Sequence, residues 1–255
     1  GGIDKKGIVG IEAMDRTSDG TVIIAGTFCD MTKGDACNMT LGELPPVNKS
    51  ADDHENGVFV AGMTPAGEWM WAMSLSNPYQ LSVIDMMVGP NDEVHLAVLH
   101  RDSLTSGDEL APGSVSEDSI AVLVLDSTGN HLHMHTVFSS QNLENIGSLC
   151  SDYSGQTYLA TSFLELVSFG DHELTSSGGT HVAVAQYNSG GWLWAKSAGG
   201  TSDASATDCD GRHDGGVAIV GDFLQNMTFG DLEIGPSIWV DFYEAHISDQ
   251  GEWLH

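Results

Sequence analysis

One pattern recurs four times along the chain, a turn glycine followed by a strand that carries alternating aromatic residues. The four copies read Gly67-Glu68-Trp69-Met70-Trp71, Gly129-Asn130-His131-Leu132-His133, Gly191-Trp192-Leu193-Trp194 and Gly251-Glu252-Trp253-Leu254-His255. The first aromatic residues stand at positions 69, 131, 192 and 253, so the period is 61 or 62 residues. Such a period is typical of proteins in which similar units stack on one another.

Each repeat offers four short runs that are rich in β-branched, apolar and aromatic residues and are separated by Gly, Asp, Asn and Ser. This pattern indicates strands rather than helices. Besides the aromatic strand, we expect first strands over residues 8–14, 81–88, 146–150 and 204–209, second strands over 23–28, 95–100, 158–163 and 218–223, and third strands over 58–63, 120–125, 181–187 and 240–247. A G-D-x-E-like turn follows the second strand at Gly107, Gly170 and Gly230, and a degenerate form stands at Gly42.

Four strands in each of four repeats predict an all-β fold, a β-propeller of four blades with four antiparallel strands each. We expect a single domain over residues 1–255, with blades over 3–75, 76–139, 140–199 and 200–255. Two stacked sandwiches would also be all-β, but they give no reason for the 61-residue period. A fragment of a six- to eight-bladed ring is the second alternative.

The stretch 158–200 reads YLATSFLELVSFGDHELTSSGGTHVAVAQYNSGGWLWAKSAGG and resembles the bacterial β-propeller repeat known as SBBP. Repeat four resembles it through Gly221-Asp222-Phe223, Phe229-Gly230-Asp231, the pair Asp241-Phe242 and Gly251-Glu252-Trp253. The resemblance implies a propeller in a large secreted or surface protein, a group whose roles vary. Repeat one departs from the pattern by an insertion over residues 29–56, and His replaces Trp at His131, His133 and His255.

The chain is strongly acidic, with 36 Asp and Glu against 8 Lys and Arg and a net charge of −28. Such a charge repels nucleic acid and anionic lipid, so neither is an expected partner. The carboxylates could hold Ca²⁺, but no D-x-D-x-D loop is present, and solubility in salt explains them as well. No apolar stretch is long enough to span a membrane, and the start at Gly1-Gly2 suggests a processed product or a segment of a longer chain.

The four cysteines lack C-x-x-C spacing, so we expect two disulfides, Cys29–Cys37 and Cys150–Cys209, rather than a metal site. Cys150 and Cys209 end the first strands of repeats three and four and should tie these blades together. Four buried thiols in a cytosolic protein are the alternative.

Three N-x-S/T sequons at Asn38, Asn48 and Asn226 favour an extracellular or cell-surface glycoprotein, although sequons also arise by chance.

His131, His133 and His135 alternate along one predicted strand and therefore share a face. Three imidazoles can bind Zn²⁺, but two of these positions hold packing tryptophans in other repeats, so packing is the competing interpretation. The tryptophans at Trp69, Trp71, Trp192, Trp194 and Trp253 could stack on sugars, but their fixed repeat positions favour packing between blades.

No nucleophile elbow, zinc-protease motif or phosphate loop occurs, so we expect no enzyme, no catalytic residue and no cofactor, with Ca²⁺ or Zn²⁺ as the open alternatives.

Gly1-Gly2 matches Gly199-Gly200 and His255 matches Trp194, so both ends fall in one repeat register. We therefore expect a structural unit of an extracellular or surface assembly, such as a filament in which copies contact one another. A propeller module that binds glycans or proteins is the alternative.

Overall fold

The computed structural model describes residues 2–3, 9–29, 37–49, 57–75, 77, 79, 81–106, 108–141, 143 and 147–254. The regular structure in these residues consists of strands only, which confirms the all-β class. The chain divides into two compact units, Gly1–Thr136 and Val137–His255. Each unit is built from two successive repeats.

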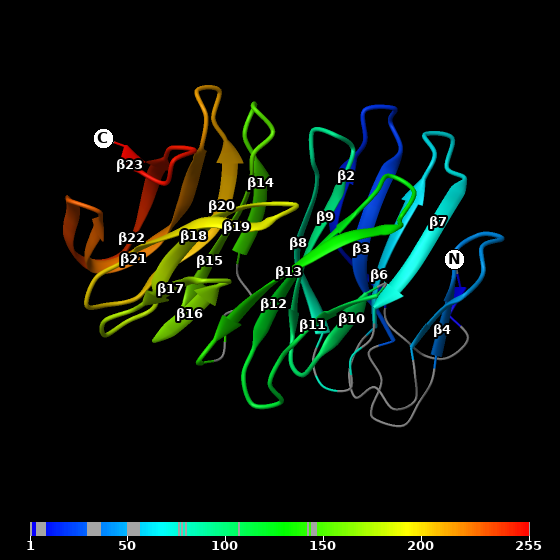
Figure 1. Cartoon of the computed structure of the whole chain (residues 1–255), viewed down its shortest axis with the longest axis horizontal. Helices are drawn as coiled ribbons and strands as arrows, with labels where there is room; N and C mark the ends of the chain where they lie inside the picture. The colour runs from blue at the N-terminus through cyan, green and yellow to red at the C-terminus, as the bar shows by residue number, and fades with distance from the viewer. Residues whose placement is uncertain are drawn as a thin grey trace. The chain divides into compact units, whose positions relative to one another are not determined.

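The first unit holds one four-stranded antiparallel sheet, formed by repeat one, and most of the four strands that repeat two contributes to a six-stranded sheet (Figure 1). Repeat one has the order β2-β3-β6-β7, with β2 (Val9–Arg16), β3 (Val22–Phe28), β6 (Gly57–Met63) and β7 (Trp69–Leu75). Repeat two has the order β8-β9-β12-β13, with β8 (Leu81–Val88), β9 (Val94–His100), β12 (Ser119–Leu125) and β13 (His131–Ser139). Strand order therefore follows the order of the strands within each repeat.

The second unit repeats this plan. Repeat three has the order β14-β15-β18-β19, with β14 (Gly147–Ser151), β15 (Thr157–Phe163), β18 (His181–Asn188) and β19 (Gly191–Ala198). Repeat four has the order β20-β21-β22-β23, with β20 (Ala204–Gly211), β21 (Val217–Phe229), β22 (Leu232–Ile247) and β23 (Trp253–Leu254). Three four-stranded sheets, together with four strands of a six-stranded sheet, thus correspond to the four sequence repeats, and closure into a propeller stays a prediction.

An extra hairpin leaves each sheet between its second and third strands. It is formed by β4 (Cys37–Thr40) and β5 (Val47–Lys49), by β10 (Leu104–Ser106) and β11 (Glu109–Ala111), by β16 (Leu166–Phe169) and β17 (His172–Thr175), and in repeat four by the extended halves of β21 and β22. The turns Gly42-Glu43, Gly170-Asp171 and Gly230-Asp231 lie between the paired hairpin strands, whereas Gly107 lies outside the described residues. The short β1 (Gly2–Ile3) pairs with β4, and the last three residues of β13 pair with β16.

Seven tight turns join first to second or third to fourth strands with one geometry. In the turn at Thr64, for example, Gly67 N–H donates to Thr64 O at 2.9 Å and Thr64 N–H donates to Glu68 O at 2.8 Å. The fourth turn residue has a left-handed φ between +61° and +91° at Gly20, Gly67, Asp92, Gly129, Gly155, Gly215 and Gly251. Because glycine adopts this conformation without steric cost, the recurring turn glycine fixes where each strand pair reverses.

The core of each unit lies between its two sheets. In the first unit Ile23, Val58 and Val60 of repeat one pack with Leu81, Leu96 and Leu123 of repeat two, and all six are buried. In the second unit Tyr158, Val182 and Val184 of repeat three pack with Ile219, Phe223 and Tyr243 of repeat four. One face of every sheet is therefore buried against the neighbouring repeat of the same unit, as expected for stacked repeats.

The repeated tryptophans have two distinct packing roles. Trp71 Nε1–H donates to Ser127 O in the next repeat, and Trp194 Nε1–H donates to Asp249 O, both at 3.0 Å. The first tryptophan of each strand instead packs on the hairpin of its own repeat, where its ring lies next to the turn glycine Gly42, Gly170 or Gly230. In each Trp-x-Trp pair, the first tryptophan thus packs on the hairpin of its own repeat, and the second contacts a turn of the next repeat.

We expect Gly129→Ala to destabilise the first unit far more than Gly67→Ala, although both glycines have a left-handed φ in equivalent turns. A Cβ at Gly129 would overlap the Trp71 ring, whereas a Cβ at Gly67 would meet nothing within 4 Å. Backbone strain alone costs about 1–2 kcal/mol, and the displaced ring should raise the loss to about 3 kcal/mol or more. Urea unfolding of the two variants measures the difference, and equal losses would show that the Trp71 contact carries no energy.

Candidate functional site

The three histidines predicted as a zinc site lie on β13 and share one face. His131 and His133 are half-buried and His135 is buried, while the intervening Leu132 is exposed. The rings of His133 and His135 have centroids 5.0 Å apart. Among the residues that the structure describes, no group of three His, Cys, Asp or Glu side chains is placed to hold a metal ion. The three rings share a face without forming a ligand set.

His131 occupies the position that the first tryptophan has in the other repeats. Its Nδ1 lies 3.1 Å from Ser106 Oγ and its Nε2 lies 3.4 Å from Glu109 Oε2, so the ring contacts both strands of its own β10–β11 hairpin. Trp69, Trp192 and Trp253 lie next to the hairpin turns of their own repeats in the same way. The packing interpretation of His131 therefore has direct structural support.

A fourth histidine, His95 on β9, belongs to the same cluster. Burial, followed by the nearby rings of His133 and His135, lowers the pKa of His95 to about 4. Burial also lowers the pKa of His133. Both rings are therefore neutral at pH 7, as buried imidazoles in a packed core should be. The sequence pattern on β13 could not reveal His95, which lies 36 residues before His131.

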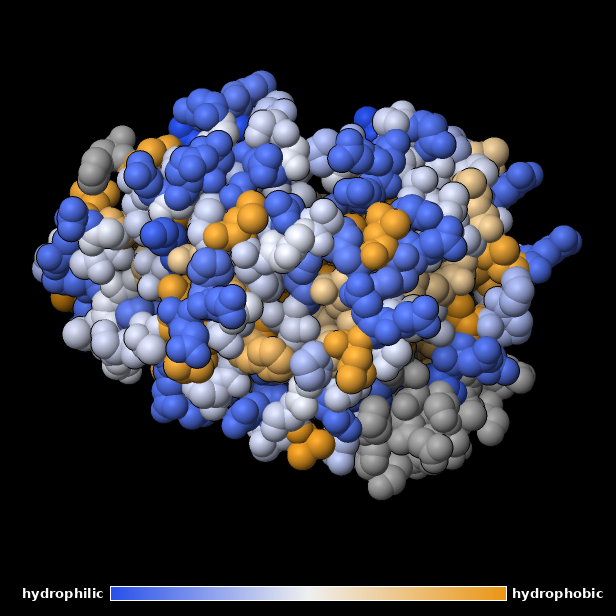
Figure 2. Space-filling model, viewed as in Figure 1, coloured by the Kyte–Doolittle hydropathy of each residue, from blue (hydrophilic) through white to orange (hydrophobic). Residues whose placement is uncertain are grey.

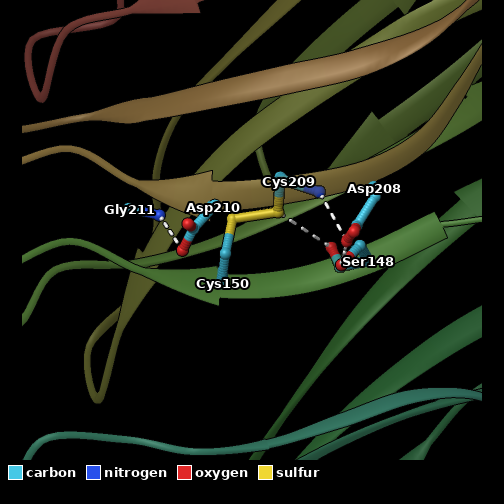
Figure 3. Close-up of a disulfide and its surroundings, with 6 residues drawn as sticks. All are labelled: Ser148, Cys150, Asp208, Cys209, Asp210 and Gly211. Atoms are coloured by element: carbon cyan, nitrogen blue, oxygen red, sulfur yellow. Dashed lines mark hydrogen bonds between the residues drawn. A yellow bond between two sulfur atoms is a disulfide. The ribbon is translucent and has the colours of Figure 1, made fainter.

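The predicted bridge between Cys150 and Cys209 is present and joins β14 to β20, the first strands of repeats three and four (Figure 3). Ser148 Oγ–H donates to Asp208 Oδ1 at 2.9 Å beside it. Cys29 is also disulfide-bonded and fully buried, whereas the side chain of Cys37, its predicted partner, lies outside the described residues. A disulfide is compatible with an extracellular location. The described residues include no helix able to cross a membrane.

Asp152, in the turn that follows Cys150, is a buried carboxylate with five donors. Its Oδ1 accepts from Ser154 N–H, Ser154 Oγ–H and Gln156 N–H at 2.7–3.0 Å. Its Oδ2 accepts from Tyr158 Oη–H at 2.8 Å and from Gly216 N–H of repeat four at 3.0 Å. Burial alone would raise the pKa of Asp152, but these donors outweigh it and lower the pKa below 3.8. Sequence reasoning missed this connection, although the Asp-x-Ser-Gly spacing at 152–155 is a signal for it.

The three sequons differ in accessibility. Asn38 and Asn48 are exposed and lie directly opposite each other on β4 and β5. Asn226 on β21 is half-buried, and its amide donates to the Glu233 side chain. Glycosylation of all three stays a prediction, and the geometry favours Asn38 and Asn48 over Asn226 as acceptors.

The least covered apolar segment of the described chain lies on β22. Ile238, Trp239 and Phe242 are 87%, 76% and 81% exposed, and Val240 is also exposed. Figure 2 shows apolar surface at the left margin of the molecule, over the β21–β22 hairpin. We call residues 238–242 the β22 strip. Exposed apolar side chains concentrated on one segment mark an interaction surface.

The third strands of repeats three and four are paired to different extents. The strand β18 pairs with β15 on one side and, over residues 182–188, with β19 on the other. In repeat four, β23 pairs with His246 and Ile247 of β22. Among the described residues, 241–245 of β22 have a strand on the β21 side.

A groove of about 860 Å³ borders the strip in the second unit. It is lined mainly by uncharged polar and small residues, among them Ser177, Thr201, Gln225, Asn226 and Ser237, together with Glu233 and Ile238. His181 closes part of it, with Nε2 2.9 Å from Gly200 O.

Comparison with known proteins adds no family to this description, because no family model matches the chain and no curated protein is similar to it.

We expect Asp152→Asn to destabilise the second unit by about 2–3 kcal/mol at neutral pH, because an amide at this buried site cannot accept from all five donors. Asp126→Asn is the matched control, since Asp126 accepts from its own turn through Thr128 and Asn130 but is only half-buried. Its loss should stay below about 1 kcal/mol.

The Asp152 effect should also depend on pH. Because folding lowers the pKa of Asp152, its contribution is complete above the unfolded-state value of about 3.9 and is lost as the pH falls below it. The difference in unfolding free energy between the parent protein and Asp152→Asn should shrink from pH 7 to pH 3 in urea titrations. A difference that stays constant would show that the carboxylate charge is irrelevant.

Proposed function

We propose that this chain is a non-enzymatic structural unit of an extracellular or cell-surface assembly, in which copies contact one another through the β22 strip. The observation that carries the proposal is the concentration of exposed Ile238, Trp239 and Phe242 on one segment of β22. Exposed apolar side chains gathered in this way favour association in water, and they fit a surface that another copy covers.

Other features support an extracellular setting. The Cys150–Cys209 bridge is favoured in an oxidising compartment, and Asn38 and Asn48 are exposed sequon residues. The net charge of −28 keeps such a unit soluble in salt.

We also propose that the four sheets are blades of a β-propeller with SBBP-like repeats. The support is the strand order 1-2-3-4 in every repeat, the sheet-on-sheet cores within each unit and the tryptophan contacts between consecutive repeats. Blades of this kind bury one face on each neighbour.

Glycan binding is the second candidate function, and the groove beside the strip favours it. Uncharged hydroxyl and amide side chains line the groove, and the exposed Trp239 follows Ile238 at its edge. An indole face next to polar groups suits a sugar ring. Binding to a glycan array that is lost in Trp239→Ala, with self-association unchanged, would favour this function over assembly.

The assembly proposal predicts that the purified chain self-associates in physiological salt. Trp239→Ser and Phe242→Ser should each weaken association by about 2 kcal/mol, or roughly 30-fold in Kd, because each removes an aromatic side chain from the contact. Leu110→Ser on β11 is the matched control, since Leu110 is 59% exposed but lies outside the strip. Light scattering and electron microscopy measure the size. A monomer in the parent protein, or equal effects of all three substitutions, would contradict the proposal.

A further inference from the structure

Repeat two differs from its neighbours in one chemical respect, because histidines stand where repeats one and three have tryptophans. His131 and His133 occupy the places of the first and second tryptophan of the aromatic strand. Tryptophan has the same charge at every pH, whereas an imidazole in water takes up a proton near about pH 6.5. The replacement therefore gives the aromatic strand of repeat two a titratable face.

The histidine cluster of His95, His131, His133 and His135 continues this face into the buried part of the repeat. His95 is 3% and His135 is 8% exposed, and the ring centroids of His133 and His135 are 5.0 Å apart. His95 pairs with apolar residues on both neighbouring strands, and a Cβ on Gly89 would lie 2.9 Å from its Nε2. A proton taken up inside the cluster is therefore withdrawn from water and lies close to further imidazoles.

Carboxylates face the cluster from three neighbouring elements of the first unit. In the β8–β9 turn, Glu93 Oε2 lies 3.9 Å from His95 Nε2, which is beyond hydrogen-bond distance. On β11, Glu109 Oε2 lies 3.4 Å from His131 Nε2. Asp85 on β8 lies on the same sheet face as His95, one residue pair further along, and its Oδ1 accepts from the next main-chain N–H. These groups favour a protonated cluster and oppose the effect of burial.

Burial nevertheless dominates at the two rings on which the switch proposed below depends most. It lowers the pKa of His133, although Glu93 and Glu109 act in the opposite direction. It also lowers the pKa of His95 to about 4, and the rings of His133 and His135 add to the effect. The folded repeat therefore strongly prefers neutral imidazoles in the cluster.

A fifth histidine opposes proton uptake from the other face of β9. His100 is fully buried, and its Nδ1 lies 2.8 Å from Asp102 O. Burial lowers the pKa of His100 and outweighs the opposing charges of Asp102 and Asp118. Both faces of β9 thus carry a buried imidazole that the folded repeat keeps neutral.

We propose that repeat two contains an acid-sensitive switch, in which protonation of the histidine cluster opens β9, β12 and β13 while the second unit stays folded. The inference goes beyond the assembly function and does not depend on it. Because folding lowers the pKa of His95, its neutral form stabilises the repeat fully above about pH 6.5, and this contribution is lost as the pH falls toward 4. The window lies above the pH range in which the carboxylate of Asp152 is protonated.

Hydrogen exchange of the full chain at pH 7 and pH 5, corrected for the intrinsic exchange rates, tests the switch. From the lowered pKa of His95 alone, protection of β9 and β13 should fall at least about 20-fold between these pH values. The strands β15 and β19 of repeat three are the internal comparison, and their protection should fall by less than about 3-fold.

Two substitutions assign the effect to the cluster. His95→Gln removes the most strongly buried ring of the cluster, so the ratio of protection at pH 7 to that at pH 5 should be about 20-fold smaller than in the parent protein. His213→Gln is the matched control, because His213 is exposed in a turn of repeat four, and it should leave the ratio unchanged.

Equal losses of protection in both units, or an unchanged ratio in His95→Gln, would overturn the inference. If His95→Gln does not fold, a titration of the His95 Cε1–H resonance in the parent protein decides the question. A midpoint below about pH 5 supports the switch, and a midpoint near about pH 6.5 overturns it, because the folded repeat would then not oppose the proton.

Discussion

The contact between a tryptophan of one repeat and the turn of the next is the constraint on which the rest of the structure depends. Trp71 and Trp194 each donate Nε1–H to a turn carbonyl, at Ser127 and Asp249, and each ring lies against the turn glycine, Gly129 or Gly251. A side chain at either glycine would push the ring away, so ring and glycine must recur together. This pairing gives a reason for the aromatic strand and the turn glycine to recur together at a period of 61 or 62 residues. It also brings consecutive sheets close enough to bury one core per unit.

Repeat two shows how the same framework tolerates a polar replacement. His131 stands where the other repeats have their first tryptophan, and its two ring nitrogens contact Ser106 and Glu109 on the hairpin. Alternate residues on a strand are separated by about 6.6 Å along the chain, whereas metal ligands must all reach within about 2 Å of one ion. The rings of three histidines on one strand face therefore reach a common ion only if their side chains turn toward it. Here the contacts with Ser106 and Glu109 direct the His131 ring toward the hairpin instead. Burial keeps His95 neutral, so the cluster behaves as part of the core.

The sequence predicted the features that depend on local pattern and on repetition. Strand positions, the four sheets and the Cys150–Cys209 bridge follow from alternation, turn glycines and matching repeat positions. It could not show that residues 240–247 differ in burial from their counterparts in β18, because both runs are apolar and burial depends on which strand lies alongside. The Asp152 contact with Gly216 was missed for a related reason, since a turn carboxylate looks the same whether it binds only its own turn or also the next repeat.

Charge and strand pairing act over different distances in this chain, and the difference bears on how copies can join. A net charge of −28 repels other copies at long range, but at physiological ionic strength the repulsion is screened beyond about 8 Å. Main-chain hydrogen bonds and apolar contacts act only after that distance is crossed. The exposed Asp241 and Glu244 stand beside the apolar side chains of the β22 strip, so a surface that packs on the strip has to suit both its apolar and its acidic residues. The acidic residues that favour solubility therefore also restrict what the strip can bind.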